Sequence, residues 1–343
     1  MDVYSLTPSE VKECIETCMK ARLVPFIVSS PGLGKSSIVK QIAKEYRLKV
    51  IDCRLSSMEP TDLNGLPWFN NGKAEFQPYE FFPTEDKAIP EGYEGWLLFL
   101  DEFNSASRAT QAAAYRVILD REIGQHKLHN NCFVVAAGNK SSDNAITNRL
   151  STAMLSRLIH FQMEPNFEDW RDNFAIPQKI DERIIAYLSM YPAKLMEFDP
   201  DKEDETFACP RTWQFASDLI KANGNEVSTK TIPLLGGAIT VAQASAFVQF
   251  CKVYQDLIRV EDILKNPNIN PPKDSASIWA IVVHLIQATD DKNYSAIFKF
   301  VDKLPPTFKV VYFSSIVKHH KELLMDPEFM EVVQGFTEYF MGK

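Results

Sequence analysis

Short apolar runs alternate with amphipathic stretches over the first half of the chain. The runs have the length of buried strands, and they predict strands around residues 23–28, 48–53, 96–101, 132–137 and 157–162. The stretches between them keep helical spacing, most clearly over residues 35–46 and 106–120. Strands that alternate with helices are typical of a parallel sheet covered on both faces. We therefore expect a three-layer αβα fold around a parallel five-stranded sheet.

A helix start is encoded before the first strand. Thr7 is followed three residues later by Glu10, with Pro8 between them. This spacing is that of a capping box with proline at the first helical position. It predicts a helix that runs to about Lys20.

The second half of the chain has a different pattern, because helical spacing replaces the strand pattern from about residue 165. Residues 266–272 contain three prolines and therefore form a linker rather than a regular helix. We expect three domains: an α/β core over residues 1–164, an α-helical domain over 165–265 and a C-terminal helical extension over 266–343. The extension is either a docking module for a specific substrate or an added part of the preceding domain.

Two hairpins are expected within the first domain. Residues 65–76 would turn at Asn71-Gly72, which is a strong hairpin signal, and residues 121–131 form a second candidate ribbon. Both ribbons are either surface decoration or, through aromatic residues such as Trp68, Phe69 and Phe76, part of a local core.

Composition narrows the class of protein. The chain has 343 residues, 45% hydrophobic and 24% charged, as expected for a globular protein with two compact units and an extension. Its net charge of -8 disfavours sequence-independent binding to nucleic acid. The uncharged stretch Thr231 to Cys251 contains Pro233, two glycines and two glutamines, so we expect a buried helix and no membrane segment.

The expected compartment is the cytoplasm. The first residues lack the basic start and apolar stretch of a secretory signal. Six cysteines form no C-x-x-C pair and have no histidine at ligand spacing, which favours reduced thiols over a metal site.

A phosphate-binding loop follows the first predicted strand. The segment comprises Ser30, Pro31, Gly32, Leu33, Gly34, Lys35, Ser36 and Ser37. Glycines let backbone N–H groups face phosphate oxygens, and the following helix N-terminus carries positive partial charge. Lys35 would reach the β- and γ-phosphates and Ser36 would hold Mg²⁺. The full pattern has glycine where this chain has Ser29, and a Gly-Lys-Ser triplet alone also occurs in ordinary turns.

A second motif supplies a further metal ligand and a general base, which the loop lacks. The strand predicted over residues 96–101 ends in Asp101 and Glu102, about 65 residues after the loop. Asp101 would complete the Mg²⁺ shell that Ser36 begins, and Glu102 would orient and deprotonate the attacking water. Phosphoryl transfer needs both groups near the γ-phosphate, so together the motifs indicate a nucleotide hydrolase.

Polar residues further along the chain extend the pattern. Asn139 ends the fourth predicted strand and would bind the γ-phosphate or the water. Arg149 and Arg157 precede the fifth strand, and Arg211 follows Pro210 at a predicted helix start. Each arginine alone is more often a surface ion-pair partner than a catalytic group.

The order of these motifs resembles that of the AAA+ ATPases, and within them the MoxR and dynein-related clade. The matching segments are residues 30–36, 59–65, 98–104, 137–139 and 153–157, and the resemblance extends over about residues 5–255. It implies that Asn139 is the sensor 1 residue, Arg157 the arginine finger given to a neighbouring subunit, and Arg211 the sensor 2 residue on a helical lid. Arg149 competes with Arg157 for the finger role.

The resemblance also implies partners and cofactors. It predicts a homo-oligomer, a hexameric ring with ATP and Mg²⁺ bound between subunits, and hairpins that face the central pore. MoxR-like proteins often act with a partner that bears a von Willebrand factor A domain. Adenine is expected over guanine, because residues 139–143 exceed the guanine-reading Asn-Lys-x-Asp motif by one residue. Val24, Pro25 and residues 176–184 are candidates for the adenine contact.

Three functions follow. The leading one is an ATPase ring that remodels or activates a protein partner. The alternatives are a motor that acts on nucleic acid and a nucleotide-switched scaffold with little turnover. The acidic net charge disfavours the motor, and the presence of both Glu102 and Arg157 disfavours the scaffold.

Overall fold

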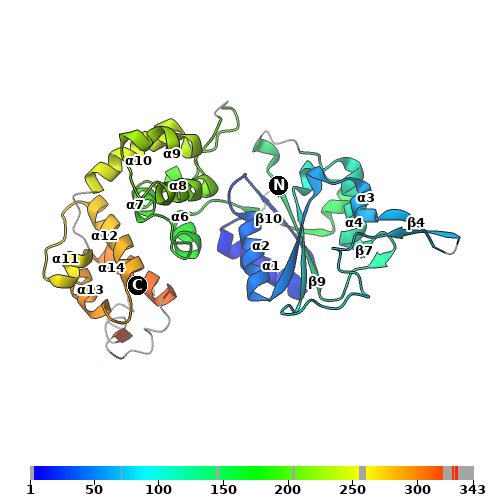
Figure 1. The fold of residues 1–343 in the computed structure, drawn as a ribbon, viewed down its shortest axis with the longest axis horizontal. Coiled ribbons are helices and arrows are strands. Elements are labelled where there is room, and N and C mark those ends of the chain that lie inside the picture. Colours follow the sequence, from blue (N-terminus) through cyan, green and yellow to red (C-terminus); the bar gives the residue numbers. More distant parts are fainter. Residues whose placement is uncertain are drawn as a thin grey trace. The chain divides into compact units, whose positions relative to one another are not determined.

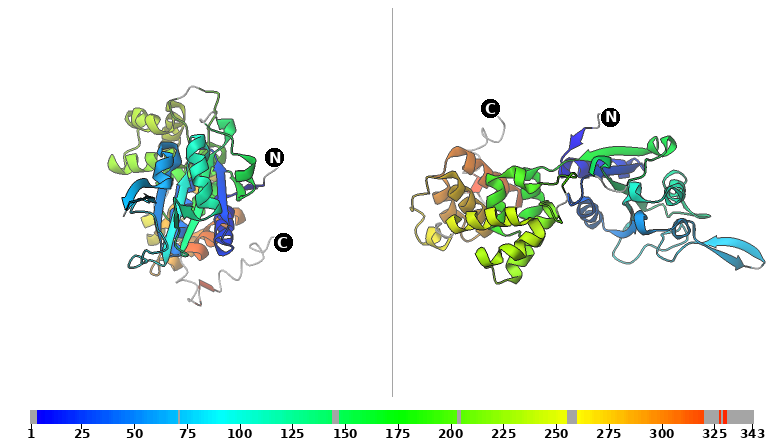
Figure 2. Two further views of the ribbon diagram at one scale, coloured as in Figure 1. Left: turned by 90° about the vertical axis from the view of Figure 1, so that its right-hand side faces the viewer. Right: turned by 90° about the horizontal axis from the view of Figure 1, so that it is seen from above.

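A computed structural model describes residues 4–70, 72–143, 147–202, 205–254, 260–319, 327 and 329–330. The chain divides into two compact units (Figures 1 and 2). The first comprises Met1–Asn166 with Asp199–Glu203, and the second comprises Phe167–Phe198 with Asp204–Lys343. The first unit is an α/β domain, and the second contains only helices among its described residues.

A parallel six-stranded sheet forms the centre of the first unit, in the order β1-β10-β2-β9-β6-β3. Its strands are β1 (Ser5–Leu6), β2 (Val24–Ser29), β3 (Leu48–Arg54), β6 (Gly95–Asp101), β9 (Cys132–Asn139) and β10 (Leu158–Met163). The five strands predicted from apolar runs are confirmed. The expected strand number is corrected to six, because β1 is too short to produce a periodic pattern.

Helices cover both faces of this sheet, so the three-layer αβα prediction is confirmed (Figure 1). The helices and 3₁₀ turns are α1 (Pro8–Lys20), α2 (Lys35–Glu45), η1 (Leu55–Ser57), α3 (Pro60–Asn64), η2 (Phe103–Ser105), α4 (Arg108–Leu119), η3 (Ser141–Asp143) and α5 (Thr152–Leu155). Helices α1 and α2 cover one face, whereas α4 buries Ala114 and Val117 against Leu98 of the other. The capping box is confirmed, because Thr7 N donates to Glu10 Oε2 at 2.8 Å and Glu10 N donates to Thr7 Oγ1 at 3.3 Å.

Both predicted hairpins form. One pairs β4 (Leu66–Asn70) with β5 (Lys73–Gln77), and the other pairs β7 (Glu122–Ile123) with β8 (His126–Lys127). The ribbon β4–β5 extends away from the central sheet of its unit (Figures 1 and 2). Trp68 is 63% exposed, Phe69 76% and Phe76 43%, which excludes the local-core interpretation. Asn71 of the predicted turn lies outside the described residues.

The second unit is a bundle of short helices. They are α6 (Phe167–Trp170), a π-helical turn (Arg171–Ala175), α7 (Glu182–Met190), η5 (Pro192–Leu195), α8 (Pro210–Ala222), η6 (Thr229–Thr231), α9 (Ile232–Ile239), α10 (Val241–Tyr254), α11 (Val260–Lys265), α12 (Ser275–Ala288), α13 (Tyr294–Val301) and α14 (Pro306–His319). The linker predicted over 266–272 is irregular chain between α11 and α12. The uncharged stretch is divided between α9 and α10, which are separated at Thr240. None of the described helices has the length and apolar character needed to cross a membrane.

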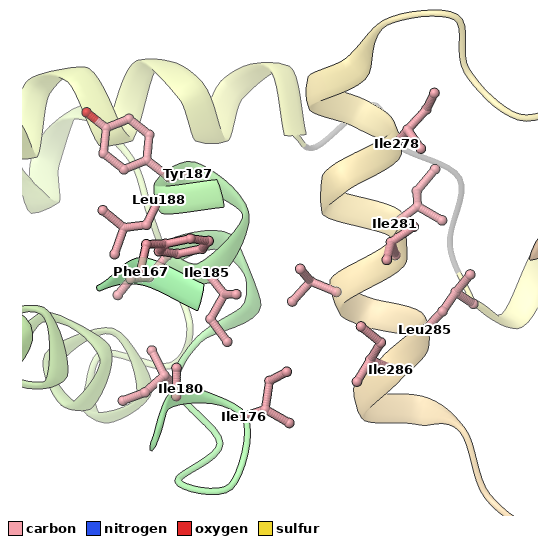
Figure 3. Close-up of a cluster of buried hydrophobic side chains, with 14 of the residues drawn as sticks. Phe167, Ile176, Ile180, Ile185, Tyr187, Leu188, Ile278, Ile281, Leu285 and Ile286 are labelled. Atoms are coloured by element: carbon pink, nitrogen blue, oxygen red, sulfur yellow. The ribbon is translucent and has the colours of Figure 1, made fainter. Parts of the chain in front are cut away.

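One hydrophobic cluster runs through the second unit. In Figure 3, Ile176 and Ile185 lie on the side that faces Ile281 and Ile286 of α12. Residues from both sides of the linker are buried in this cluster. The described part of the predicted extension therefore packs with the preceding helices, which favours the interpretation that it is an added part of the preceding domain. The division into three domains stays a prediction, and residues 320–326, 328 and 331–343 of the extension lie outside the described residues.

Candidate functional site

The register of the sheet brings the predicted site residues of the first unit to one edge. Strands β2 and β9 pair with Ser29 opposite Asn139, and β9 pairs with β6 on its other side. All three strands are parallel, so their carboxyl ends meet at that edge. In an open α/β sheet this edge is where ligands bind.

The loop after β2 has the conformation of a phosphate cradle. Gly32 has φ 80° and Gly34 has φ 93°, values that favour glycine. Gly34 is the N-cap of α2, which begins at Lys35 and has no side-chain cap. Ser37 N and Ile38 N donate to Gly34 O, and the helix N-terminus without a capping side chain carries the positive partial charge that can bind an anion. Ser36 and Ser37 lie in the first turn of this helix.

Lys35 is held across the ends of β2 and β9. Its Nζ donates to Ser29 O at 3.2 Å, to Ser29 Oγ at 3.1 Å and to Asn139 Oδ1 at 3.1 Å. Ser29 is fully buried, and its hydroxyl donates to Ser30 O at 3.0 Å. The serine that replaces the usual glycine thus adds an acceptor for the ammonium group.

Ser36 and Asp101 are neighbours despite their separation along the chain. Ser36 Oγ donates to Asp101 Oδ2 at 3.3 Å, and Glu102 N donates to Asp101 Oδ1 at 2.8 Å. Burial raises the pKa of Asp101, although Lys35 acts in the opposite direction. One hydroxyl and one carboxylate fit Mg²⁺, which binds few protein oxygens and completes its shell with phosphate oxygens and water. Accordingly, the described residues contain no cluster of three or more His, Cys, Asp or Glu that would form a metal cage.

Glu102 is bound by a residue that the sequence analysis did not identify. Ser56 Oγ donates a hydrogen bond to Glu102 Oε2. Glu102 itself has φ 54°, in the left-handed region that costs energy for a non-glycine residue. Ser56 reaches it because β3 pairs with β6, which places Arg54 opposite Asp101. Only this register, and no sequence motif, could have indicated Ser56.

Asn104 holds the backbone of Asn139 and was also missed as a site residue. Its Oδ1 accepts from Asn139 N at 3.0 Å and its Nδ2 donates to Asn139 O at 2.7 Å. A Cβ on Gly138 would lie 2.4 Å from Asn104 Oδ1, so glycine is required there. The two-way bond fixes the end of β9, from which the Asn139 side chain extends toward Lys35.

The three predicted arginines lie in different places. Arg157 is exposed on the first unit, where its guanidinium lies over the ring of Tyr115. Arg149 is exposed on the same unit. Arg211 lies in the first turn of α8 in the second unit. Of the adenine candidates, Val24 and Pro25 are buried in β2, and residues 176–184 belong to the second unit.

Comparisons with known proteins match part of the chain. Residues 26–158 match the model of the AAA domain family, dynein-related subfamily. No curated protein matches the chain.

Among solved structures, the chain is similar to NtrX from Brucella abortus in complex with ATP, with 13% identity over 98% of this chain and 69% of that chain and a TM-score of 0.39. It is also similar to the RuvB Holliday junction branch migration motor of Thermotoga maritima, with 14% identity over 75% of this chain and 74% of that chain and a TM-score of 0.36. A candidate ATPase from Cytophaga hutchinsonii has 14% identity over 89% of this chain and 79% of that chain, with a TM-score of 0.37. Likenesses at this level carry no weight for function.

The raised pKa of Asp101 predicts that its charge destabilises the nucleotide-free fold. A carboxyl whose folded-state pKa is raised favours the unfolded state above that pKa, and the penalty disappears as the pH falls below the ordinary value. Asp101→Asn keeps an acceptor for Glu102 N and should raise Tm at pH 7 without nucleotide or divalent cation. The gain should shrink toward pH 4 in thermal unfolding followed by circular dichroism. Asp120, an exposed aspartate at the end of α4, changed to Asn, is the control, and a lower Tm for Asp101→Asn would contradict this explanation.

Proposed function

We propose that the protein is a Mg²⁺-dependent ATPase that works as a ring, because residues 26–158 match the model of the AAA domain family, dynein-related subfamily. The ring would be a hexamer of identical subunits that uses ATP hydrolysis to remodel or activate a protein partner. A partner with a von Willebrand factor A domain is the candidate that the MoxR resemblance implies.

The observation that carries this proposal is the convergence of two motifs on one edge of the sheet. Ser36 lies 3.3 Å from Asp101, and Lys35 lies 3.1 Å from Asn139, measured between their side-chain polar atoms. These pairs join residues 65 and 104 positions apart in the chain. A triphosphate at the N-terminus of α2 would meet the lysine, the metal ligands and the sensor residue together.

Each residue then has a role in hydrolysis. The loop N–H groups and Lys35 would bind the phosphates, and Ser36 with Asp101 would hold Mg²⁺, which neutralises charge on the phosphates. Glu102, once its carboxylate is released from the hydrogen bond with Ser56, would take a proton from the attacking water. Asn139 would position the water or the γ-phosphate.

A neighbouring subunit would complete the site. An arginine supplied across an interface contributes about 10³ to 10⁵ in rate to phosphoryl transfer, so an isolated subunit should be a poor ATPase. We assign this role to Arg157, and we assign the sensor 2 role on the helical second unit to Arg211.

The ribbon β4–β5 supports a protein partner over nucleic acid. One face of the ribbon is apolar and exposed. It contains two cross-strand pairs, Phe69 with Ala74 and Pro67 with Phe76. Between residues 59 and 94 the sequence has eight Asp or Glu and two Lys. The exposed apolar face suits an apolar polypeptide, and the acidic excess of the surrounding segment disfavours contact with phosphate groups.

Glu102→Gln should bind ATP and fail to hydrolyse it. The amide keeps the size and an acceptor oxygen but cannot take a proton, so kcat should fall by about 10² or more. Calorimetry would measure ATP binding, and phosphate release would measure turnover.

Glu94→Gln is the matched control for this experiment. Glu94 is exposed and pairs with Arg47 just before β6 begins, far along the strand from the site. It should hydrolyse ATP at the wild-type rate. Wild-type turnover by Glu102→Gln would remove Glu102 from the role of base.

Mixed rings test whether Arg157 acts on a neighbouring subunit. Arg157→Ala and Lys35→Ala should each be inactive alone. A working interface needs an Arg157→Ala subunit, which keeps Lys35, beside a Lys35→Ala subunit, which supplies Arg157. In a 1:1 mixture about one interface in four has this arrangement, so about a quarter of wild-type hydrolysis should return. Sedimentation velocity would verify that each variant assembles.

The same mixture made with Arg149→Ala distinguishes the two arginines. This variant should keep most of its own activity if Arg157 is the finger. Absence of rescue at every Arg157→Ala to Lys35→Ala ratio, with assembly intact, would count against action across the interface.

A further inference from the structure

The two candidate finger arginines differ in how the fold holds them. Arg157 Cζ lies 5.1 Å from the centroid of the Tyr115 ring. Its Nη1 donates to Ala153 O at 2.8 Å and to Ser156 Oγ at 3.2 Å. Arg149 is exposed and makes no hydrogen bond, ion pair or ring contact within the part of the chain that the structure describes. Only Arg157 is therefore ordered by its surroundings.

The ring under Arg157 belongs to a separate, well-anchored element. Tyr115 lies on α4, half-buried and packed against the hydrophobic cluster of the sheet. The adjacent Ala114 and the following Val117 are buried in that cluster, so the ring position is set by the core. A long arginine side chain otherwise has large rotamer freedom, which must be lost before it can bind phosphate. A rigid platform removes part of that cost in advance.

The contacts of Arg157 leave the Nε and Nη2 groups of its guanidinium available to bind phosphate. A cation over an aromatic ring uses its face, and both hydrogen bonds use Nη1. Within the described residues Nη2 and Nε make no hydrogen bond. These in-plane N–H groups are the ones that pair with phosphate oxygens.

We propose that Tyr115 is a positioning residue for Arg157, which it holds on the surface of one subunit for the nucleotide of the next. The inference rests on the proposed function and adds to it, because it selects Arg157 over Arg149 by its preorganisation. Tyr115 does not contact nucleotide; it acts through the arginine.

Tyr115→Phe and Tyr115→Leu separate the ring from the packing. Both keep an apolar side chain against the cluster, but only phenylalanine keeps the aromatic face. Tyr115→Phe should match wild type. Tyr115→Leu should lower kcat of the assembled ring by about twofold to fivefold, the effect of losing an exposed cation–π contact, with KM for ATP unchanged.

Mixed rings distinguish positioning from general damage. Tyr115→Leu is placed either in the Lys35→Ala subunit, which supplies Arg157, or in the Arg157→Ala subunit, which supplies the nucleotide site. The first placement should reduce rescue by about twofold to fivefold and the second should leave it unchanged.

Three outcomes of these experiments would show that Tyr115 does not position Arg157. Equal loss from both placements, a raised KM with unchanged kcat, or wild-type kcat for Tyr115→Leu would overturn the proposal while leaving the proposed ATPase intact. Full hydrolysis by Arg157→Ala would overturn both the finger assignment and the role of Tyr115. That outcome is recognised separately, because the Arg157→Ala variant is measured alone.

Discussion

The parallel register of β2, β9 and β6 is the constraint on which the rest of the first unit depends. It sets Ser29 opposite Asn139 and brings the end of β6 beside them, so a loop, a carboxylate pair and an amide meet although the chain separates them widely. A shift of one residue would turn each of these side chains to the other face of the sheet. The buried apolar faces of the strands prevent such a shift, and the same burial that stabilises the fold therefore aligns the site.

The site brings together the ammonium group of Lys35 and the carboxylates of Asp101 and Glu102. The Lys35 ammonium donates to Ser29 and Asn139, and burial raises the pKa of the half-buried Asp101 carboxyl more than the nearby Lys35 lowers it. Ser56 donates a hydrogen bond to the carboxylate of Glu102, whose backbone is left-handed. An anionic triphosphate with its metal would satisfy both charges at once, and this complementarity links the geometry to nucleotide hydrolysis.

Periodic and local features could be predicted from the sequence, whereas features set by register could not. Five strands, the capping box, both hairpins and the AAA resemblance over residues 26–158 are confirmed. Strand β1 has no pattern because it has two residues. Ser56, Asn104 and Tyr115 belong to no motif, and their contacts arise only when distant segments pack. The sequence also could not predict that helices on both sides of the linker share one core, because helical spacing does not indicate which helices pack together.

Calorimetric titration of Mg²⁺ and ATP into the intact protein tests the central claim most directly, because it asks whether the loop and the acidic strand end bind one ligand. The account predicts one nucleotide per chain, with binding lost in Lys35→Ala and the Mg²⁺ dependence of affinity lost in Asp101→Asn. No heat with the wild-type chain, or a Mg²⁺ dependence that survives in Asp101→Asn, would contradict it.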